Sequence, residues 1–160
     1  MDLADLRRRR LTLRPDADAS AWFALAQVLE QPLLAGEPFG WLPAPRQELR
    51  QWRWEALALA LAQAVAHDET PLVITVAQIM LDMDPLHETT LTLLMRLHLR
   101  RGESAQAATR YRAFRRALAC QVHTTLDGAN MPSAETQALY AAACDGGGLL
   151  STTDATPDTA

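Results

Sequence analysis

The feature that most constrains the fold is an apolar pattern that occurs twice in the chain, over residues 57–80 and again over residues 91–114. Within residues 84–118, apolar side chains follow helical spacing in two runs, which are separated by a turn at Gly102. A shift back by one repeat places these positions on earlier apolar positions. The aligned pairs are Leu91 with Leu57, Leu94 with Ala60, Ala107 with Val73, Tyr111 with Ala77, and Phe114 with Met80. We therefore expect two successive helical hairpins, with Asp68 at the turn position that Gly102 occupies in the second.

The second hairpin has the clearer pattern. Asp84 and Pro85 are expected to begin its first helix, because proline is favourable in the first turn. The predicted inner faces carry Leu91, Leu94, Met95 and His98 on the first helix, and Ala107, Ala108, Tyr111, Phe114 and Leu118 on the second. Such a seam of small and aromatic residues favours two antiparallel helices. The period of the pattern matches the length of a tetratricopeptide repeat, which is a pair of helices.

The whole chain is predicted to be all-α, with about six helices in tetratricopeptide-like hairpins. They are expected over residues 21–30, 46–67, 71–81, 85–100, 107–118 and 133–143. Residues 10–14 alternate as Arg-Leu-Thr-Leu-Arg, which predicts a short strand. A loop over residues 31–45 carries the apolar anchors Leu33, Leu34, Phe39, Trp41 and Leu42. The last stretch, residues 145–160, is rich in small and polar residues and is expected to be a disordered tail.

Composition indicates a soluble cytoplasmic domain. The chain has 160 residues, enough for one domain with a real core, and a formal net charge of −4. Its longest apolar stretch, residues 56–66, is too short for a transmembrane helix. Cys120 and Cys144 are the two cysteines, and free thiols are the default for so few. All basic residues other than histidine are arginines, so arginine by itself carries no functional meaning.

No catalytic, cofactor-binding or metal-binding residues are expected. Cys120 and His123 supply two possible ligands, whereas a zinc site needs three or four from the protein. A glycine-rich phosphate loop, a nucleophile elbow and a pair of catalytic carboxylates are all absent from the sequence. His98 lies at seam spacing and is interpreted as a satisfied core histidine, and Tyr111 and Phe114 as core aromatics.

Three blocks of the sequence resemble the bacterial transcriptional activator domain of the Streptomyces antibiotic regulatory protein family. The first is Leu33-Leu34-Ala-Gly-Glu-Pro-Phe39, followed by Trp41 and by Arg46-Gln-Glu-Leu49. The second is Asp84-Pro85-Leu86, followed by Leu94-Met95-Arg96, Gly102 and Ala107-x-x-x-Tyr111-x-x-x-Arg115-Arg116-x-Leu118. The third is Pro132-Ser133-x-Glu135-Thr136-x-Ala138-Leu139-Tyr140. The resemblance covers roughly residues 33–143.

The resemblance implies an all-helical, tetratricopeptide-like module that follows a winged-helix DNA-binding domain. Residues 17–144 are then expected to form this module, and residues 1–16 a basic lead-in that ends a truncated winged helix. The family carries a helical hairpin before its Pro-Leu-Leu block, whereas this sequence predicts a single helix there, over residues 21–30. The chain is interpreted either as a piece of a longer regulator cut at this border, or as a gene product without the DNA-reading domain.

Charge is strongly segregated along the helical repeats. Six acidic residues and no arginine lie between Trp54 and Met95, whereas seven arginines accompany Glu103 alone in residues 96–116. Such a polarised surface can steer a partner, although ordinary solvated helix faces give the same pattern. The predicted partner-binding residues are Arg96, Arg100, Arg112, Arg115, Arg116, and the exposed member of the pair Trp52 and Trp54.

The sequence therefore predicts a non-catalytic interaction domain of a bacterial transcriptional regulator. Expected partners are a second copy of the chain, a DNA-binding domain or the transcription machinery, with no membrane and with DNA contacted only indirectly. Two alternatives stay open. One is a tetratricopeptide-like scaffold unrelated to transcription. The other is direct nucleic-acid binding through the basic segment from Arg7 to Arg14, which would depend steeply on salt.

Overall fold

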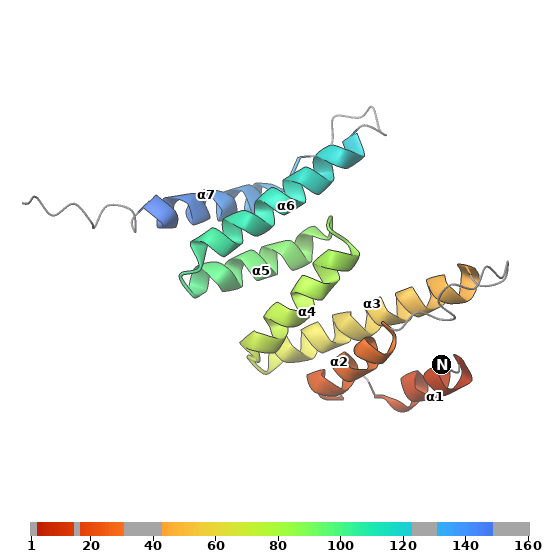
Figure 1. Ribbon diagram of the computed structural model, residues 1–160. Helices are drawn as coiled ribbons and strands as arrows, with labels where there is room; N and C mark the ends of the chain where they lie inside the picture. The colour runs from red at the N-terminus through yellow and green to blue at the C-terminus, as the bar shows by residue number, and fades with distance from the viewer. Residues whose placement is uncertain (1–2, 15–16, 31–42, 123–130, 149–160) are drawn as a thin grey trace, which may run out of the picture. The chain divides into compact units, whose positions relative to one another are not determined.

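The structure is a computed structural model that describes residues 3–14, 17–30, 43–122 and 131–148. Within these ranges the chain forms seven α-helices and no strand, which confirms the all-α prediction (Figure 1). The helices are α1 Leu3–Thr12, α2 Ala19–Val28, α3 Pro43–Ala66, α4 Thr70–Met83, α5 Glu88–Arg100, α6 Ser104–Val122 and α7 Ala134–Gly148. None of the described helices is long and apolar enough to span a membrane.

The chain divides into two compact units, and the division falls within α4. The first unit comprises Met1–Val76 and the second comprises Ala77–Ala160. Each unit has its own buried residues.

The first unit is built on the packing of α2 against α3. On α3, Ala56, Ala60 and Ala64 recur every four residues and are fully buried, so they form one smooth stripe along the helix. Small side chains at this spacing allow a second helix to approach closely. On α2, Trp22 and Leu25 are buried as well, so the core of this unit combines large and small side chains.

The first helix corrects two predictions. Residues 10–14 are not a strand, because α1 is helical over Leu3–Thr12. Two helices rather than one precede residue 31. An alternation of five residues is too short to distinguish a strand from a helix. Leu6 on α1 is only 2% exposed, so α1 contributes an apolar residue to the core.

In the second unit, α5, α6 and α7 pack pairwise against one another (Figure 1). The inner face predicted for α5 is confirmed, because Leu91, Leu94, Met95 and His98 are all buried. On α6, Ala107, Ala108 and Phe114 are buried, whereas Tyr111 and Leu118 are half-buried. The second predicted hairpin is therefore present, and α7 covers part of both of its helices.

The two turns that end α3 and α5 have the same hydrogen-bond pattern, which supports the repeat seen in the sequence. The amide of Glu69 donates to the carbonyl of Ala64 at 2.9 Å, and the amide of Glu103 donates to the carbonyl of His98 at 2.8 Å. Asp68 and Gly102 each donate to the carbonyl three residues earlier. This pair of bonds is the Schellman motif of helix C-termini. Asp68 therefore stands at the turn position predicted for it.

Helix α5 begins three residues later than Pro85, where it was predicted to begin. Asp84 forms a turn instead, since its Oδ1 accepts a hydrogen bond of 3.1 Å from the amide of Leu86. His87 is the N-cap of α5, and its Nδ1 accepts from the amide of Thr90. A capping side chain satisfies one of the unpaired amides of the first turn, which decides where the helix starts.

The predicted cap of the last helix is confirmed. Ser133 Oγ accepts a hydrogen bond of 3.3 Å from the amide of Thr136 at the start of α7. The helix continues to Gly148, beyond the predicted end near Ala143. The predicted apolar anchors in residues 31–42, and residues 149–160 of the predicted tail, lie outside the described residues.

Candidate interaction surface

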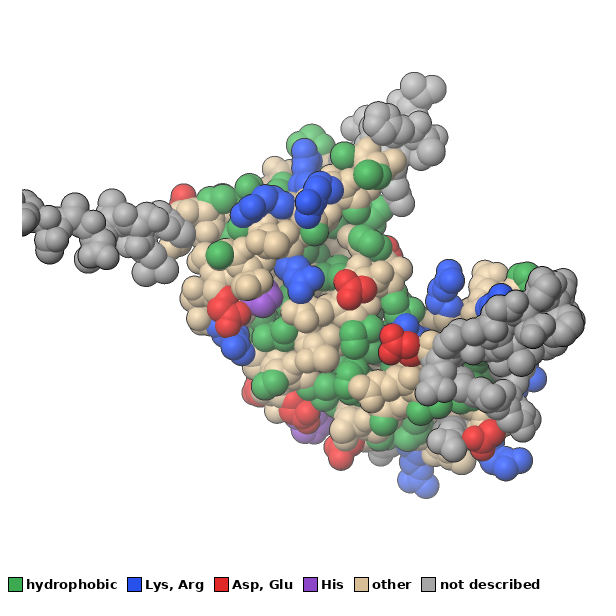
Figure 2. All heavy atoms as spheres, in the orientation of Figure 1, with side chains coloured by type: hydrophobic (Ala, Val, Ile, Leu, Met, Phe, Trp, Pro, Cys, Tyr) green, Lys and Arg blue, Asp and Glu red, His purple; other side chains and the backbone are tan. Residues whose placement is uncertain are grey.

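The strongest candidate surface is the outer face of α6. Arg112, Arg115 and Arg116 are exposed, and their spacing of three and four residues places them on one side of the helix. None of the three forms an ion pair with an acidic residue of the described ranges. Figure 2 shows basic side chains gathered over this helix. We call these three residues the α6 basic face.

The two predicted arginines of α5 behave differently from each other. Arg96 forms an ion pair with Glu135 of α7, so its charge is compensated within the unit. Arg100 is exposed and has no ion pair among the described side chains. Their neighbour Arg101 is paired with Glu103 at 2.7 Å. The predicted basic surface is thus concentrated on α6, with Arg100 as a further uncompensated charge.

An aromatic pair fixes α7 beside the α6 basic face. The rings of Tyr111 on α6 and Tyr140 on α7 are stacked, with centroids 4.1 Å apart and planes at 15°. A hydrogen bond with Cys144 raises the pKa of Tyr140, and the nearby Arg112 opposes this shift. Tyr111 is therefore half-buried in a helix contact, as its seam position indicated.

A second contact joins the start of α5 to the start of α7. Glu88 on α5 accepts hydrogen bonds from the amide of Ser133 at 2.7 Å and from Thr136 Oγ1 at 2.5 Å. Desolvation raises the pKa of Glu88, but the bonds from Thr136 and Ser133 outweigh it, so the pKa is lowered overall. Ser133, Glu135 and Thr136 belong to one sequence block, and each has a structural role in holding α7 in place.

Trp52 and Trp54 differ in exposure, as expected for residues two positions apart on a helix. Trp52 is buried, and the guanidinium groups of Arg7 and Arg10 lie 5.8 and 5.1 Å from its ring centroid. Trp54 is half-buried, so it is the more accessible member of the pair. Among the described residues, the arginines that lie over Trp52 come from α1.

Two arginines of α1 form ion pairs within the unit. Arg7 pairs with Glu48 at 3.1 Å and Arg10 pairs with Glu55 at 2.5 Å, and both glutamates lie on α3. These contacts, together with the cation–π contacts on Trp52, hold α1 to α3. We call this set the α1 clasp. The sequence did not reveal it, because the partners are 41 and 45 residues apart.

His98 is a core histidine, as predicted, but the prediction that its hydrogen bonds are satisfied is wrong for one of its two ring nitrogens. Its Nδ1 lies 2.6 Å from Glu103 Oε2, and its Nε2 is buried without a hydrogen-bond partner in the described ranges. The hydrogen bond with His98, followed by that with Arg101, lowers the pKa of Glu103. This cluster tightens the turn between α5 and α6.

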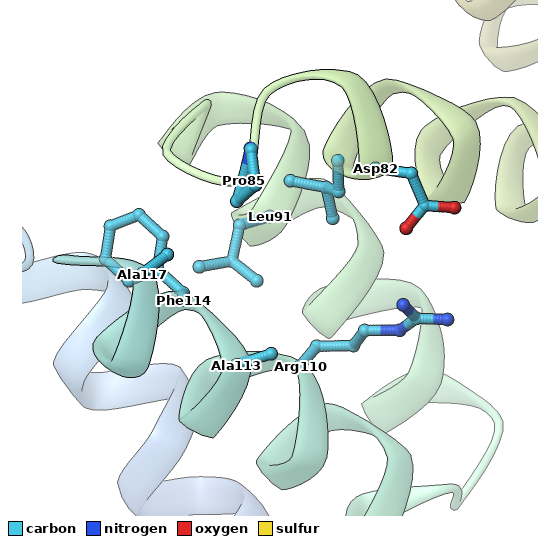
Figure 3. A pocket seen from close by; sticks show the side chains of 8 residues that line it. Asp82, Pro85, Leu91, Arg110, Ala113, Phe114 and Ala117 are labelled. Carbon is cyan, nitrogen blue, oxygen red and sulfur yellow. The ribbon is translucent and has the colours of Figure 1, made fainter. Parts of the chain in front are cut away.

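A hollow of about 360 Å³ lies on another side of α6 (Figure 3). Its lining is mainly apolar and comes from the end of α4, the following turn, α5 and α6. The residues are Leu81, Asp82, Pro85, Leu91, Arg110, Ala113, Phe114 and Ala117. No group of three or more histidines, cysteines and acidic residues able to hold a metal occurs in the described part of the chain.

These features define the class of protein as an all-α helical-repeat domain with a charged outer helix and an apolar hollow. The family model of the bacterial transcriptional activator domain matches residues 6–142, and the chain belongs to this family. It is therefore a domain that is associated with transcriptional activators, and the family is a regulatory one. Comparisons with curated proteins and with solved structures gave no significant match.

Proposed function

We propose that this chain is a non-catalytic effector domain of a bacterial transcriptional regulator that binds an acidic surface of a protein partner through the α6 basic face. The observation that carries the proposal is the contrast among its arginines. Arg96 and Arg101 are compensated by Glu135 and Glu103, whereas the arginines of the α6 basic face have no acidic partner among the described residues.

The electrostatics of this face favour an acidic partner. Like charges three and four residues apart on a helix repel one another by a few tenths of a kcal/mol, roughly 0.2–0.5 per pair. Carboxylates of a partner relieve this repulsion, and they also accept bidentate hydrogen bonds from guanidinium groups. Complementary charge accelerates encounter and selects the partner more than it adds affinity.

Trp54 is proposed as a separate contact in the first unit. It is a half-buried aromatic residue, and tryptophan is enriched among residues that dominate binding energy. Arg100 is proposed to contribute one more positive charge in the second unit.

The proposed partners are a second copy of the chain or the transcription machinery, with DNA contacted through a separate winged-helix domain. Direct nucleic-acid binding from Arg7 to Arg14 is less well supported, because Arg7 and Arg10 are engaged with Glu48 and Glu55. Phosphate contacts require arginines that are available to replace counterions.

A charge-reversal experiment tests the proposal. We would compare the wild-type chain with the double variant Arg112→Glu/Arg116→Glu, using sedimentation velocity for self-association and biolayer interferometry for purified bacterial RNA polymerase holoenzyme. The matched control is Arg8→Glu/Arg50→Glu, which changes the same charge at two other exposed arginines.

The proposal expects the α6 double variant to lose at least one of these interactions while the control retains it. Circular dichroism would establish that both variants keep their helices. Equal binding by all three proteins, or wild-type binding to neither target, would contradict the proposal. Binding to a DNA duplex that the α6 variant loses would point to phosphate as the ligand instead.

A further inference from the structure

The hollow on α6 has the chemistry of a site for one large apolar side chain. Leu81, Leu91 and Phe114 are buried beneath it, and the exposed residues at its mouth include Pro85 and Ala113. The small side chains of Ala113 and Ala117 leave the space open on the α6 side. Burying a leucine or phenylalanine in such a space is favourable by the area it removes from water.

Two opposite charges lie together at one end of the hollow. Figure 3 shows Asp82 and Arg110 at the same end, with Pro85, Leu91 and Phe114 away from them. Neither charge is engaged in an ion pair among the described side chains. An occupant that carries one acidic and one basic group beside its apolar side chain would satisfy both.

The openness of the site favours a protein segment over a small molecule. Asp82, Pro85 and Ala113 are exposed, and Arg110 and Ala117 are half-exposed, so most of the rim faces solvent. Small-molecule sites bury about 70–90% of their ligand, and their volumes are about 300–1,000 Å³. The hollow of about 360 Å³ is at the low end of that range. Interface anchors instead occupy pockets of this kind while the rest of the partner lies outside.

We propose that this hollow binds a partner protein segment in which one large apolar side chain is followed, on one side, by an acidic and a basic residue that lie next to each other. The apolar side chain lies over Leu91 and Phe114, the acidic residue pairs with Arg110, and the basic residue pairs with Asp82. This site is distinct from the α6 basic face, because Arg110, Ala113 and Ala117 recur at helical spacing on another side of α6.

A peptide titration followed by NMR tests this proposal. The probe is an acetylated and amidated heptapeptide with a leucine near one end, a glutamate and an arginine next to each other near the other end, and alanines elsewhere. Comparison peptides replace leucine by serine, or glutamate by glutamine, and free leucine serves as a small-molecule probe. Chemical shifts of the full chain, labelled with nitrogen-15, report the site and the affinity.

The proposal expects shifts at the residues that line the hollow, with affinity about tenfold or more lower for the serine peptide. Arg110→Gln should lower the affinity for the glutamate peptide by about two- to fivefold and leave the affinity for the glutamine peptide unchanged. Arg50→Gln, at an exposed arginine of α3, is the matched control and should change neither. Ala113→Trp should fill the hollow and abolish binding.

Three results would overturn the proposal. They are an absence of shifts around the hollow at millimolar peptide, equal affinity for the leucine and serine peptides, and binding of free leucine as tight as that of the peptide. If Ala113→Trp disturbed the helix content seen by circular dichroism, the Arg110→Gln comparison would still decide the matter, since it changes only a rim residue.

Discussion

Asp68 and Gly102 occupy the same turn position in the two successive repeats and share the same left-handed backbone, with φ of 56° and 73°. They are the only described residues with positive φ. Each follows the end of a helix and donates the same backbone hydrogen bond. The apolar repeat that runs through the sequence thus extends to the conformation of single turn residues.

Because Asp68 and Gly102 share this backbone conformation, substitutions at the two positions should change the free energy of unfolding in opposite directions. Glycine tolerates positive φ, whereas the same backbone costs other residues roughly 1 kcal/mol. Gly102→Ala should lower the free energy of unfolding by about 1 kcal/mol, and Asp68→Gly should raise it by about 0.5–1 kcal/mol. No atom within 4 Å would meet a Cβ at Gly102, so the first effect comes from the backbone alone. Urea titration checks both, and the same sign for the two variants would contradict this explanation.

The bond between Thr136 and Glu88 should stabilise the second unit. Thr136 is fully buried and donates its hydroxyl to the carboxylate. A hydrogen bond to a charged group is worth about 1.5–3 kcal/mol, so Thr136→Val should lower the free energy of unfolding by about that amount. Thr75→Val is a suitable control, because its exposed hydroxyl bonds only to the carbonyl of Pro71. Equal losses in the two variants, measured by urea titration, would refute the role of Glu88.

The lowered pKa of Glu88 predicts how stability depends on pH. Because its folded pKa lies below the ordinary value of 4.5, the unfolded chain binds the proton more readily. The contribution of Glu88 to stability is therefore complete above pH 4.5 and is lost as the pH falls through the lower, folded value. Thermal unfolding of Glu88→Gln should change less with pH in that acidic window than the wild type does. Glu69→Gln, at an exposed turn residue, is the control and should follow the wild type.

The α1 clasp predicts that α1 detaches when its arginines lose their charge. Exposed cation–π contacts contribute about 0.5–1 kcal/mol and surface ion pairs about 0.2–1 kcal/mol each. Arg7→Gln/Arg10→Gln should therefore speed amide hydrogen exchange in α1 by several-fold, with little change in α5 to α7. Arg8→Gln, at an exposed residue of the same helix, should have little effect. High salt should weaken the difference, and unchanged exchange at low salt would contradict the clasp.

The helices and their inner faces could be predicted because they depend on local periodicity. Leu91, Leu94 and Met95 are buried where the spacing placed them. Helix α1 was missed because its stability depends on Glu48, Glu55 and Trp52, which lie far along the chain. Short alternating segments take their structure from such tertiary contacts rather than from their own pattern.

The candidate site was predictable to a lesser extent. The spacing of Arg112, Arg115 and Arg116 shows in the sequence that they share a helix face. The pairing of Arg96 with Glu135 cannot be seen in the sequence, because it joins residues of two helices that are 39 positions apart. The hollow was not predicted either, since it requires Ala113 and Ala117 to meet residues of α4 and α5 in space.

The proposed effector role is tested by transcription from a reporter promoter to which this chain is tethered by a heterologous DNA-binding domain. We expect the wild-type fusion to raise transcription, Arg112→Glu/Arg116→Glu to lose the increase, and Arg8→Glu/Arg50→Glu to keep it. Equal fusion levels in immunoblots would exclude differences in abundance. A wild-type fusion that leaves the reporter unchanged, or an α6 double variant as active as the wild type, would rule out the α6 basic face as the effector surface.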